Sequence, residues 1–153
     1  IDEIHAELPD FHYAILRHDR PDTEIQARFS LPFVIAVCLV HGRLTGKHLA
    51  DPRASGEDIW KLIECTNIRQ VVPRRPDMNF DPEQPDRLRV RLISGEVIEE
   101  SCAFPKGSPN VPVSRATILA KYAENAAPLR VHPDLQSWAR SPDLAAFIES
   151  VTA

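Results

Sequence analysis

Residues that could bind an anion stand at the start of the most hydrophobic segment of the chain. Arg28 and Ser30 directly precede the apolar run from Leu31 to Val40. A guanidinium can hold a carboxylate through two parallel hydrogen bonds, and the N–H groups and dipole at a helix N-terminus favour the same charge. The pattern predicts a carboxylate-binding role for Arg28 and Ser30. A solvated arginine and a plain helix cap are the alternatives for these two side chains.

Other basic residues could also contact an anion. Lys106 is followed by a glycine in a turn-rich loop over residues 106–112. Arg87, Arg89 and Arg91 alternate with apolar residues, which places them on one face of a predicted strand. Lys106 and this arginine face are therefore candidates for anion binding. A turn whose glycine frees the backbone and a solvated outer face explain the same residues equally simply.

The histidines and cysteines lack the spacing of a metal site. The imidazoles considered are His12, His18, His41 and His48. The thiols are Cys38, Cys65 and Cys102. Neither set contains the close pairs, or the i, i+4 pair with a third donor, that zinc sites use. We therefore expect no metal, and we expect the thiols to be reduced and buried.

Composition limits the classes of function. The 153 residues are 43% hydrophobic and 26% charged, close to the average for soluble globular proteins. The 18 Lys and Arg are scattered among 22 Asp and Glu, so no surface that follows nucleic-acid phosphates is expected. The longest apolar run is roughly half a membrane span, and no signal peptide is visible. These features predict a cytoplasmic protein without nucleic-acid or membrane partners.

The longest predicted helix spans residues 31–41. Ser30 can cap it, Pro32 suits its first turn, and Gly42 follows the last apolar residues as a stop signal. The side chains from Val34 to Val40 are apolar around the whole helix. We therefore expect this helix to be buried on every side.

Strand patterns on both sides of this helix indicate a small sheet. Ile4, Ala6 and Leu8 alternate with polar residues, and residues 68–72 form a second candidate strand. A turn at Ser94-Gly95 joins two further strands into a hairpin over residues 87–103. The chain already shows the strand pattern at Ile1, which is not Met, so we expect further sequence upstream.

The remaining segments are predicted to be helical or irregular. Residues 57–63 fit a short helix, residues 73–86 a proline-rich loop, and Ser114 and Ser141 each begin a helix. Strands and helices do not follow the regular alternation of a parallel sheet. The sequence therefore predicts an α+β fold with a small antiparallel or mixed sheet covered by helices and a C-terminal helical segment.

Three motifs resemble those of MmgE/PrpD proteins, the family of 2-methylcitrate dehydratase. Residues 27–37, ARFSLPFVIAV, with Leu39 and residues 42–45, resemble the AKFS-LPY-AVA-L-G pattern, although Phe33 replaces the more usual tyrosine. Residues 89–96 resemble the V-V-L-DG hairpin, and residues 105–114 resemble the P-G-P-NPLS segment. Order and spacing agree from residue 1 to about residue 126.

The resemblance implies a lid of a two-domain enzyme. Residues 1–113 would form the α+β lid, and residues 114–153 would return as helices to an N-terminal helical domain outside this sequence. Similar proteins are lyases and isomerases of small di- or tricarboxylates: 2-methylcitrate dehydratase of propionate metabolism, cis-aconitate decarboxylase and iminodisuccinate epimerase. They need no metal or organic cofactor, and family analogy indicates a homodimer.

The resemblance also implies the chemistry and one site residue. Proton transfer beside a carboxylate requires a base and a cationic group, and the family's principal His and Lys residues lie upstream of Ile1. The chain is therefore expected to be an inactive fragment of a dehydratase. Tyr13 lies in a segment resembling one in cis-aconitate decarboxylases whose tyrosine reaches the cleft; packing is its alternative role. A related decarboxylase or epimerase, or a binding or assembly module without chemistry, remains open.

Overall fold

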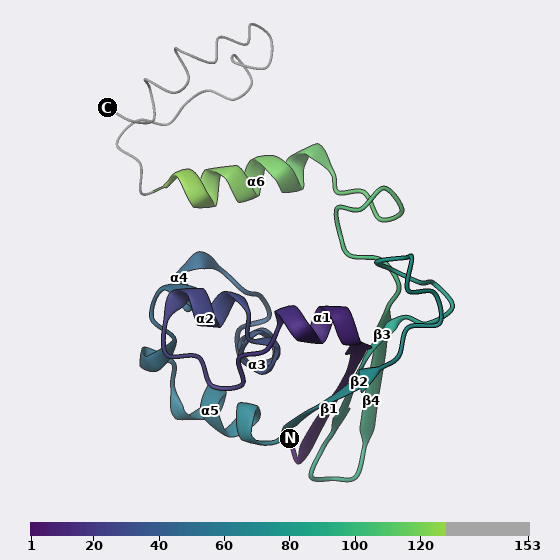
Figure 1. Ribbon diagram of the computed structural model, residues 1–153. Helices are drawn as coiled ribbons and strands as arrows, with labels where there is room; N and C mark the ends of the chain where they lie inside the picture. Colours follow the sequence, from purple (N-terminus) through teal and green to yellow (C-terminus); the bar gives the residue numbers. More distant parts are fainter. Residues whose placement is uncertain (128–153) are drawn as a thin grey trace, which may run out of the picture. The chain divides into compact units, whose positions relative to one another are not determined.

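The computed structural model describes residues 1–127 (Figure 1). The chain divides into two units, residues 1–111 and 112–153. The first unit contains β1 (Glu3–Pro9), α1 (Asp10–Ile15), α2 (Glu24–Arg28), α3 (Leu31–His41), α4 (Gly46–Ala50), η1 (Pro52–Ala54), α5 (Glu57–Glu64), β2 (Thr66–Val71), β3 (Asp86–Arg91) and β4 (Val97–Cys102). The second unit contains α6 (Arg115–Ala126). The helix predicted from Ser141 lies outside the described residues.

A mixed sheet organises the first unit. Within residues 1–127 it has four strands in the order β2-β1-β3-β4. β1 pairs in parallel with β2 and antiparallel with β3, and β3 and β4 form the predicted hairpin around Gly95, whose φ is +88°. Parallel strands need a long crossover, which α1 to α5 provide. The predicted α+β class with a mixed sheet is therefore confirmed.

Helix α3 begins and ends at the predicted residues. The Ser30 hydroxyl accepts a hydrogen bond from the Phe33 N–H at 3.3 Å, and Gly42 ends the helix with a φ of +73°. The expectation of burial on every side is wrong for the last turn, where Leu39 and Val40 are exposed. The first turns pack on α5 and the sheet, but within residues 1–111 no element covers the last turn.

Helix α3 joins two small cores. Phe33, Ala36 and Val37 pack with Ile59 and Ile63 of α5. On the next face of α3, Ile35 packs against the inner face of the sheet, in the cluster formed by Ile4, Ala6, Ile35 and Val90. Because both clusters depend on α3, the helix fixes the distance between α5 and the sheet.

The proline-rich loop between β2 and β3 is held by its own side chains. The Gln84 amide oxygen accepts a hydrogen bond from the Arg74 N–H at 2.7 Å, and its NH₂ group donates to the Val72 carbonyl at 3.1 Å. Arg74 also forms an ion pair with Glu83 at 3.4 Å. These contacts join the two ends of the loop and carry the chain from β2 to the start of β3.

The outer face of the sheet is charged and largely self-paired. Arg89 pairs with Glu99 at 2.8 Å, and Arg91 pairs with Glu3 at 2.6 Å. Hydrogen bonds from His5 and Arg91 lower the pKa of Glu3. Arg89 and Arg91, two of the three arginines predicted to share one strand face, are thus already paired with carboxylates of neighbouring strands. No helix within residues 1–127 is long and apolar enough to cross a membrane.

Candidate functional site

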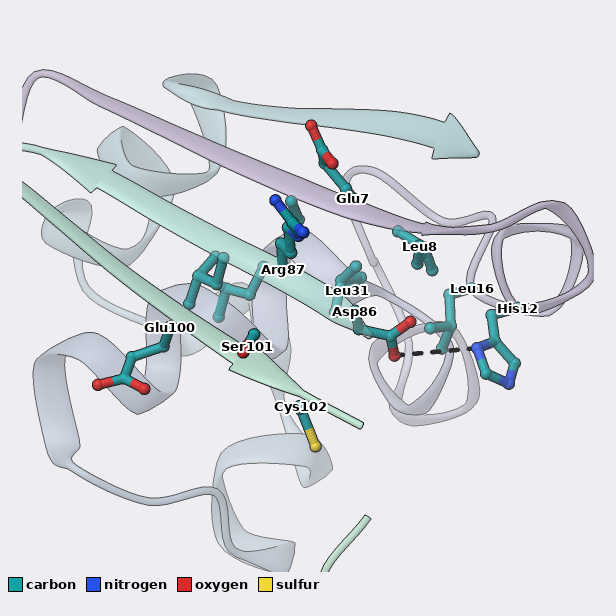
Figure 2. Close-up of a pocket in the computed structure, with 13 residues that line it drawn as sticks. Glu7, Leu8, His12, Leu16, Leu31, Asp86, Arg87, Glu100, Ser101 and Cys102 are labelled. Atoms are coloured by element: carbon teal, nitrogen blue, oxygen red, sulfur yellow. Dashed lines mark ion pairs between the residues drawn. The ribbon is translucent and has the colours of Figure 1, made fainter. Parts of the chain in front are cut away.

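A cavity of about 340 Å³ lies on the inner face of the sheet, beside α1 and α3 (Figure 2). A volume of this size is in the range of small-molecule sites, about 300–1,000 Å³. Its apolar lining comes from Ala6, Leu8, Leu16, Leu31, Ile35 and Leu88. Its polar lining comes from Glu7, His12, Asp86, Arg87, Glu100, Ser101 and Cys102. The largest share of the wall is hydrocarbon, so the cavity suits an apolar group.

The sheet register determines which charged side chains face the cavity. Asp86 lies opposite Cys102, and Glu100 lies opposite Leu88, so these residues share the inner face. Glu7 and Arg87 lie opposite each other at the alternate positions, which belong to the outer face. The charged side chains directed to the inner side are therefore acids and one histidine.

His12 and Asp86 form the polar end of the cavity. The Nδ1 atom of His12 lies 3.9 Å from Oδ2 of Asp86, within ion-pair range but beyond a hydrogen bond (Figure 2). The His12 ring also contacts the rings of Phe11 and Phe80, with centroid distances of 4.2 and 5.4 Å. Burial raises the pKa of Asp86, and the charge of His12 opposes this effect.

The cavity is a poor site for a di- or tricarboxylate. An anion placed there would meet the carboxylates of Asp86 and Glu100 in surroundings poor in polar groups. Bringing like charges together in such a place is unfavourable. By itself the cavity therefore does not provide a complete site for a substrate with several negative charges.

Replacing Asp86 with asparagine should slightly stabilise the protein at neutral pH. A carboxyl group whose pKa is raised in the folded state favours folding when protonated, and this contribution is lost as pH rises through that pKa. The Asp86 side chain is 41% exposed, so water screens it and the gain should be at most about 1 kcal/mol. Urea unfolding at pH 7 and pH 4 measures the difference, which should shrink at the lower pH. Asp77→Asn, at an exposed acid in the loop that precedes β3, is the control, and a stability loss specific to Asp86→Asn at pH 7 would contradict the expectation.

The residues predicted to bind or transform a substrate lie apart from this cavity. Tyr13 is half-buried on α1, and its hydroxyl has no hydrogen-bond partner among residues 1–127. Arg28 is exposed at the end of α2 and pairs with Glu24. Lys106 is exposed in a turn closed by a hydrogen bond from the Gly107 N–H to the Val111 carbonyl at 2.8 Å. Within the described chain, none of these side chains, nor that of Ser30, lines the cavity.

Ser30 serves the fold directly. Its side chain is fully buried and caps α3, and its backbone forms an isolated bridge with Arg17. The cap alternative considered for this residue is thus confirmed, and Arg28, two positions earlier, is directed to an ion pair on its own helix. Arg28 and Ser30 lie near each other only because they are two residues apart in the sequence.

Ser30→Ala should destabilise the protein by about 0.5–2 kcal/mol, because the Phe33 N–H would lose its acceptor at a buried helix start. Chemical denaturation gives the value. Ser30→Thr, which keeps an uncharged hydroxyl acceptor, should retain more of the stability than alanine does. Equal stability of Ser30→Ala and the wild type would contradict the capping role.

The thiols differ from the sequence-based expectation. All three are free, as expected, but Cys38 and Cys102 are exposed and Cys65 is only half-buried. Cys38 lies where α3 leaves the core, so its apolar sequence neighbours did not bring burial, and Cys102 ends the edge strand β4, which is exposed along its length. Desolvation still raises the pKa of Cys38 and of Cys65, which favours their protonated thiol forms. Within residues 1–127 no three His, Cys, Asp or Glu side chains are grouped to hold a metal ion.

The polar end of the cavity is not apparent from the sequence pattern. The available signal was local and concerned Asp86 alone, which occupies an inward position of β3, a strand that otherwise alternates between apolar and charged residues. His12 was considered only as a metal ligand. Its pairing with Asp86 depends on the register of β1 and β3, which no short-range spacing specifies.

The comparison with protein-family models matches residues 1–140 to the MmgE/PrpD C-terminal domain. No individual curated protein matches the chain. The match covers most of the 153 residues and agrees with the α+β fold and with the three motifs, which lie at α3, at the β3–β4 hairpin and ahead of α6. The chain therefore belongs to the MmgE/PrpD family and carries its C-terminal domain.

Proposed function

We propose that this chain is the lid of a cofactor-independent lyase of the 2-methylcitrate dehydratase type. The observation that carries the proposal is the match of residues 1–140 to the MmgE/PrpD C-terminal domain. The reaction is removal of water from a small di- or tricarboxylate, started by proton transfer at a carbon beside a carboxylate. An N-terminal helical domain of the same enzyme supplies the base and the main cationic groups.

The chemistry of the described residues supports a catalytic site whose groups come from both the lid and the N-terminal helical domain. Dehydration next to a carboxylate needs a base and positive charge where the transition state becomes more negative. The cavity of the lid is mostly apolar, and the acids in its lining outnumber its basic groups, His12 and Arg87. The lid therefore contributes single side chains to a cleft completed by the other domain.

We assign Tyr13, Arg28 and Lys106 as those contributions. The Tyr13 hydroxyl would donate a hydrogen bond to a substrate carboxylate or relay a proton, and its lack of a partner within residues 1–127 supports this role. Arg28 and Lys106 are exposed cations that would bind the outer carboxylates. Ser30 would act indirectly, by holding the start of α3. The enzyme would work as a cytoplasmic homodimer in propionate metabolism.

Turnover assays on the full gene product and on residues 1–153 alone test the proposal. The full product should consume 2-methylcitrate or citrate and release the unsaturated acid, with the same rate after treatment with a metal chelator. The 153 residues alone should be inactive, because in this proposal the base and the main cationic groups belong to the N-terminal helical domain. Robust turnover by residues 1–153, or inactivity of the full product toward every acid tested, would refute the proposal.

The products also distinguish the related reactions. Release of carbon dioxide from cis-aconitate would indicate a decarboxylase, which the likeness around Tyr13 favours over an epimerase. Inversion of iminodisuccinate without loss of mass would indicate an epimerase. Tight carboxylate binding without turnover by the full product would indicate a module that kept the lid fold without its chemistry.

A further inference from the structure

Helix α1 has little to stabilise it internally. It has only six residues, and its first turn has no side-chain cap. Helices much shorter than about 12 residues are unstable in isolation and depend on tertiary packing. Within the described part of the chain, however, none of the α1 side chains is fully buried. The position of α1 must therefore come from a few partial contacts.

His12 makes the contacts that join α1 to a distant part of the chain. Its ring lies 5.4 Å from that of Phe80 in the proline-rich loop, and its Nδ1 atom lies 3.9 Å from Asp86 at the start of β3. The side chain is only 19% exposed. Leu16, four residues later on the same side of the chain, also lines the cavity (Figure 2). Thus His12 attaches one side of α1 to the sheet and the loop, beside Phe11, which also faces the loop.

Tyr13 is the next residue on this short helix. Successive residues of an α-helix are rotated by about 100°, so a helix fixed through His12 directs Tyr13 to a neighbouring side. Consistently, His12 lines the cavity and Tyr13 does not. Any tilt or unwinding of α1 would move the Tyr13 hydroxyl, because the six residues offer no second anchored turn.

We propose that His12, held by Phe80 and Asp86, is a positioning residue that fixes α1 and thereby places the Tyr13 hydroxyl for the reaction. This inference rests on the proposed function, in which Tyr13 contacts the substrate. A displacement of about 1 Å can reduce a reaction rate by about 100-fold. Loss of the His12 contacts should therefore lower kcat by about 10- to 100-fold and change KM little.

Kinetics of the full gene product test this role. His12→Ala should show the loss in kcat, and His12→Phe, which keeps a ring against Phe80, should recover part of it. His18→Ala is the matched control, because His18 is also half-buried but does not line the cavity. In a Tyr13→Phe background, His12→Ala should cause little further loss, since both changes remove the same hydroxyl contact. A multiplicative loss in the double variant, or an unchanged kcat in His12→Ala and His12→Phe, would overturn the proposal.

A spectroscopic measurement separates this inference from the proposed function. Fluorotyrosine incorporated into the full product, with the Tyr13 signal assigned by Tyr13→Phe, reports the surroundings of the phenol without any substrate. His12→Ala should shift or broaden the Tyr13 fluorine signal, and His18→Ala should leave it in place. An inactive wild type would refute the proposed function while this readout still decides whether His12 holds α1. If His12→Ala fails to fold, the same signal in His12→Gln, which removes the ring that contacts Phe80, decides, and an unchanged signal refutes the anchoring.

Discussion

Replacing Phe33 with alanine should lower the free energy of unfolding by about 3–5 kcal/mol, the usual cost of deleting a buried aromatic side chain. Phe33 is fully buried in the cluster that joins α3 to α5, where Ala36, Val37 and Ile59 surround it. The alanine neighbours are too small to fill the space left behind, so most of the volume would remain as a cavity. Since small proteins are stable by only about 5–15 kcal/mol, this one change could remove much of the total.

Urea denaturation measures the loss, with an unchanged denaturant slope showing that the extent of unfolding is the same. Phe29→Ala is the matched control, because Phe29 is the same residue type four positions earlier but is 41% exposed. It should cost about 1 kcal/mol or less. Similar losses for the two variants would show that Phe33 does not fill the core of this unit.

Removing the Tyr13 hydroxyl should lower kcat of the full gene product by about 10- to 100-fold. A hydrogen bond to a charged group contributes roughly 1.5–3 kcal/mol, and each 1.36 kcal/mol corresponds to about a tenfold change. In Tyr13→Phe the ring is retained, and the hydroxyl has no hydrogen-bond partner among residues 1–127. The fold should therefore keep its stability while the reaction slows.

Steady-state kinetics with the acid identified in the turnover assays, together with thermal unfolding, checks both halves of this expectation. Tyr122→Phe, at the other tyrosine of the chain, is the comparison and should leave kcat near the wild-type value. A Tyr13→Phe enzyme with full activity would remove Tyr13 from the site. A large loss of stability would instead assign the hydroxyl to packing.

Local signals in the sequence were sufficient to define α3 and the hairpin. Ser30, Pro32 and Gly42 act within one or two turns of the helix, so their effects on its ends can be read from neighbouring residues. Alternation from residue 87 onward around Gly95 likewise fixes a two-stranded antiparallel pair. The family motifs lie on these same local elements, which is why the resemblance and the fold class agree with the structure.

Burial could not be determined in the same way. The apolar residues from Val34 to Val40 gave no indication that the last turn would be uncovered, because exposure depends on which elements pack against each turn. The thiol of Cys38 illustrates the same point, since it is exposed despite its apolar neighbours in the sequence. A hydrophobic pattern shows which side chains favour burial. Which of them are in fact buried depends on the elements that pack against them.

The sequence by itself determined the element types, the caps of α3 and the family. Only the tertiary structure decided that β1 pairs in parallel with β2 and that His12 meets Asp86 beside an apolar cavity. Helix caps and turns are made by residues close together in the chain and leave a local pattern. Strand order and the His12–Asp86 pair join segments far apart in the chain, and they are selected by the shared burial of Ile4, Ile35 and Val90 in one core.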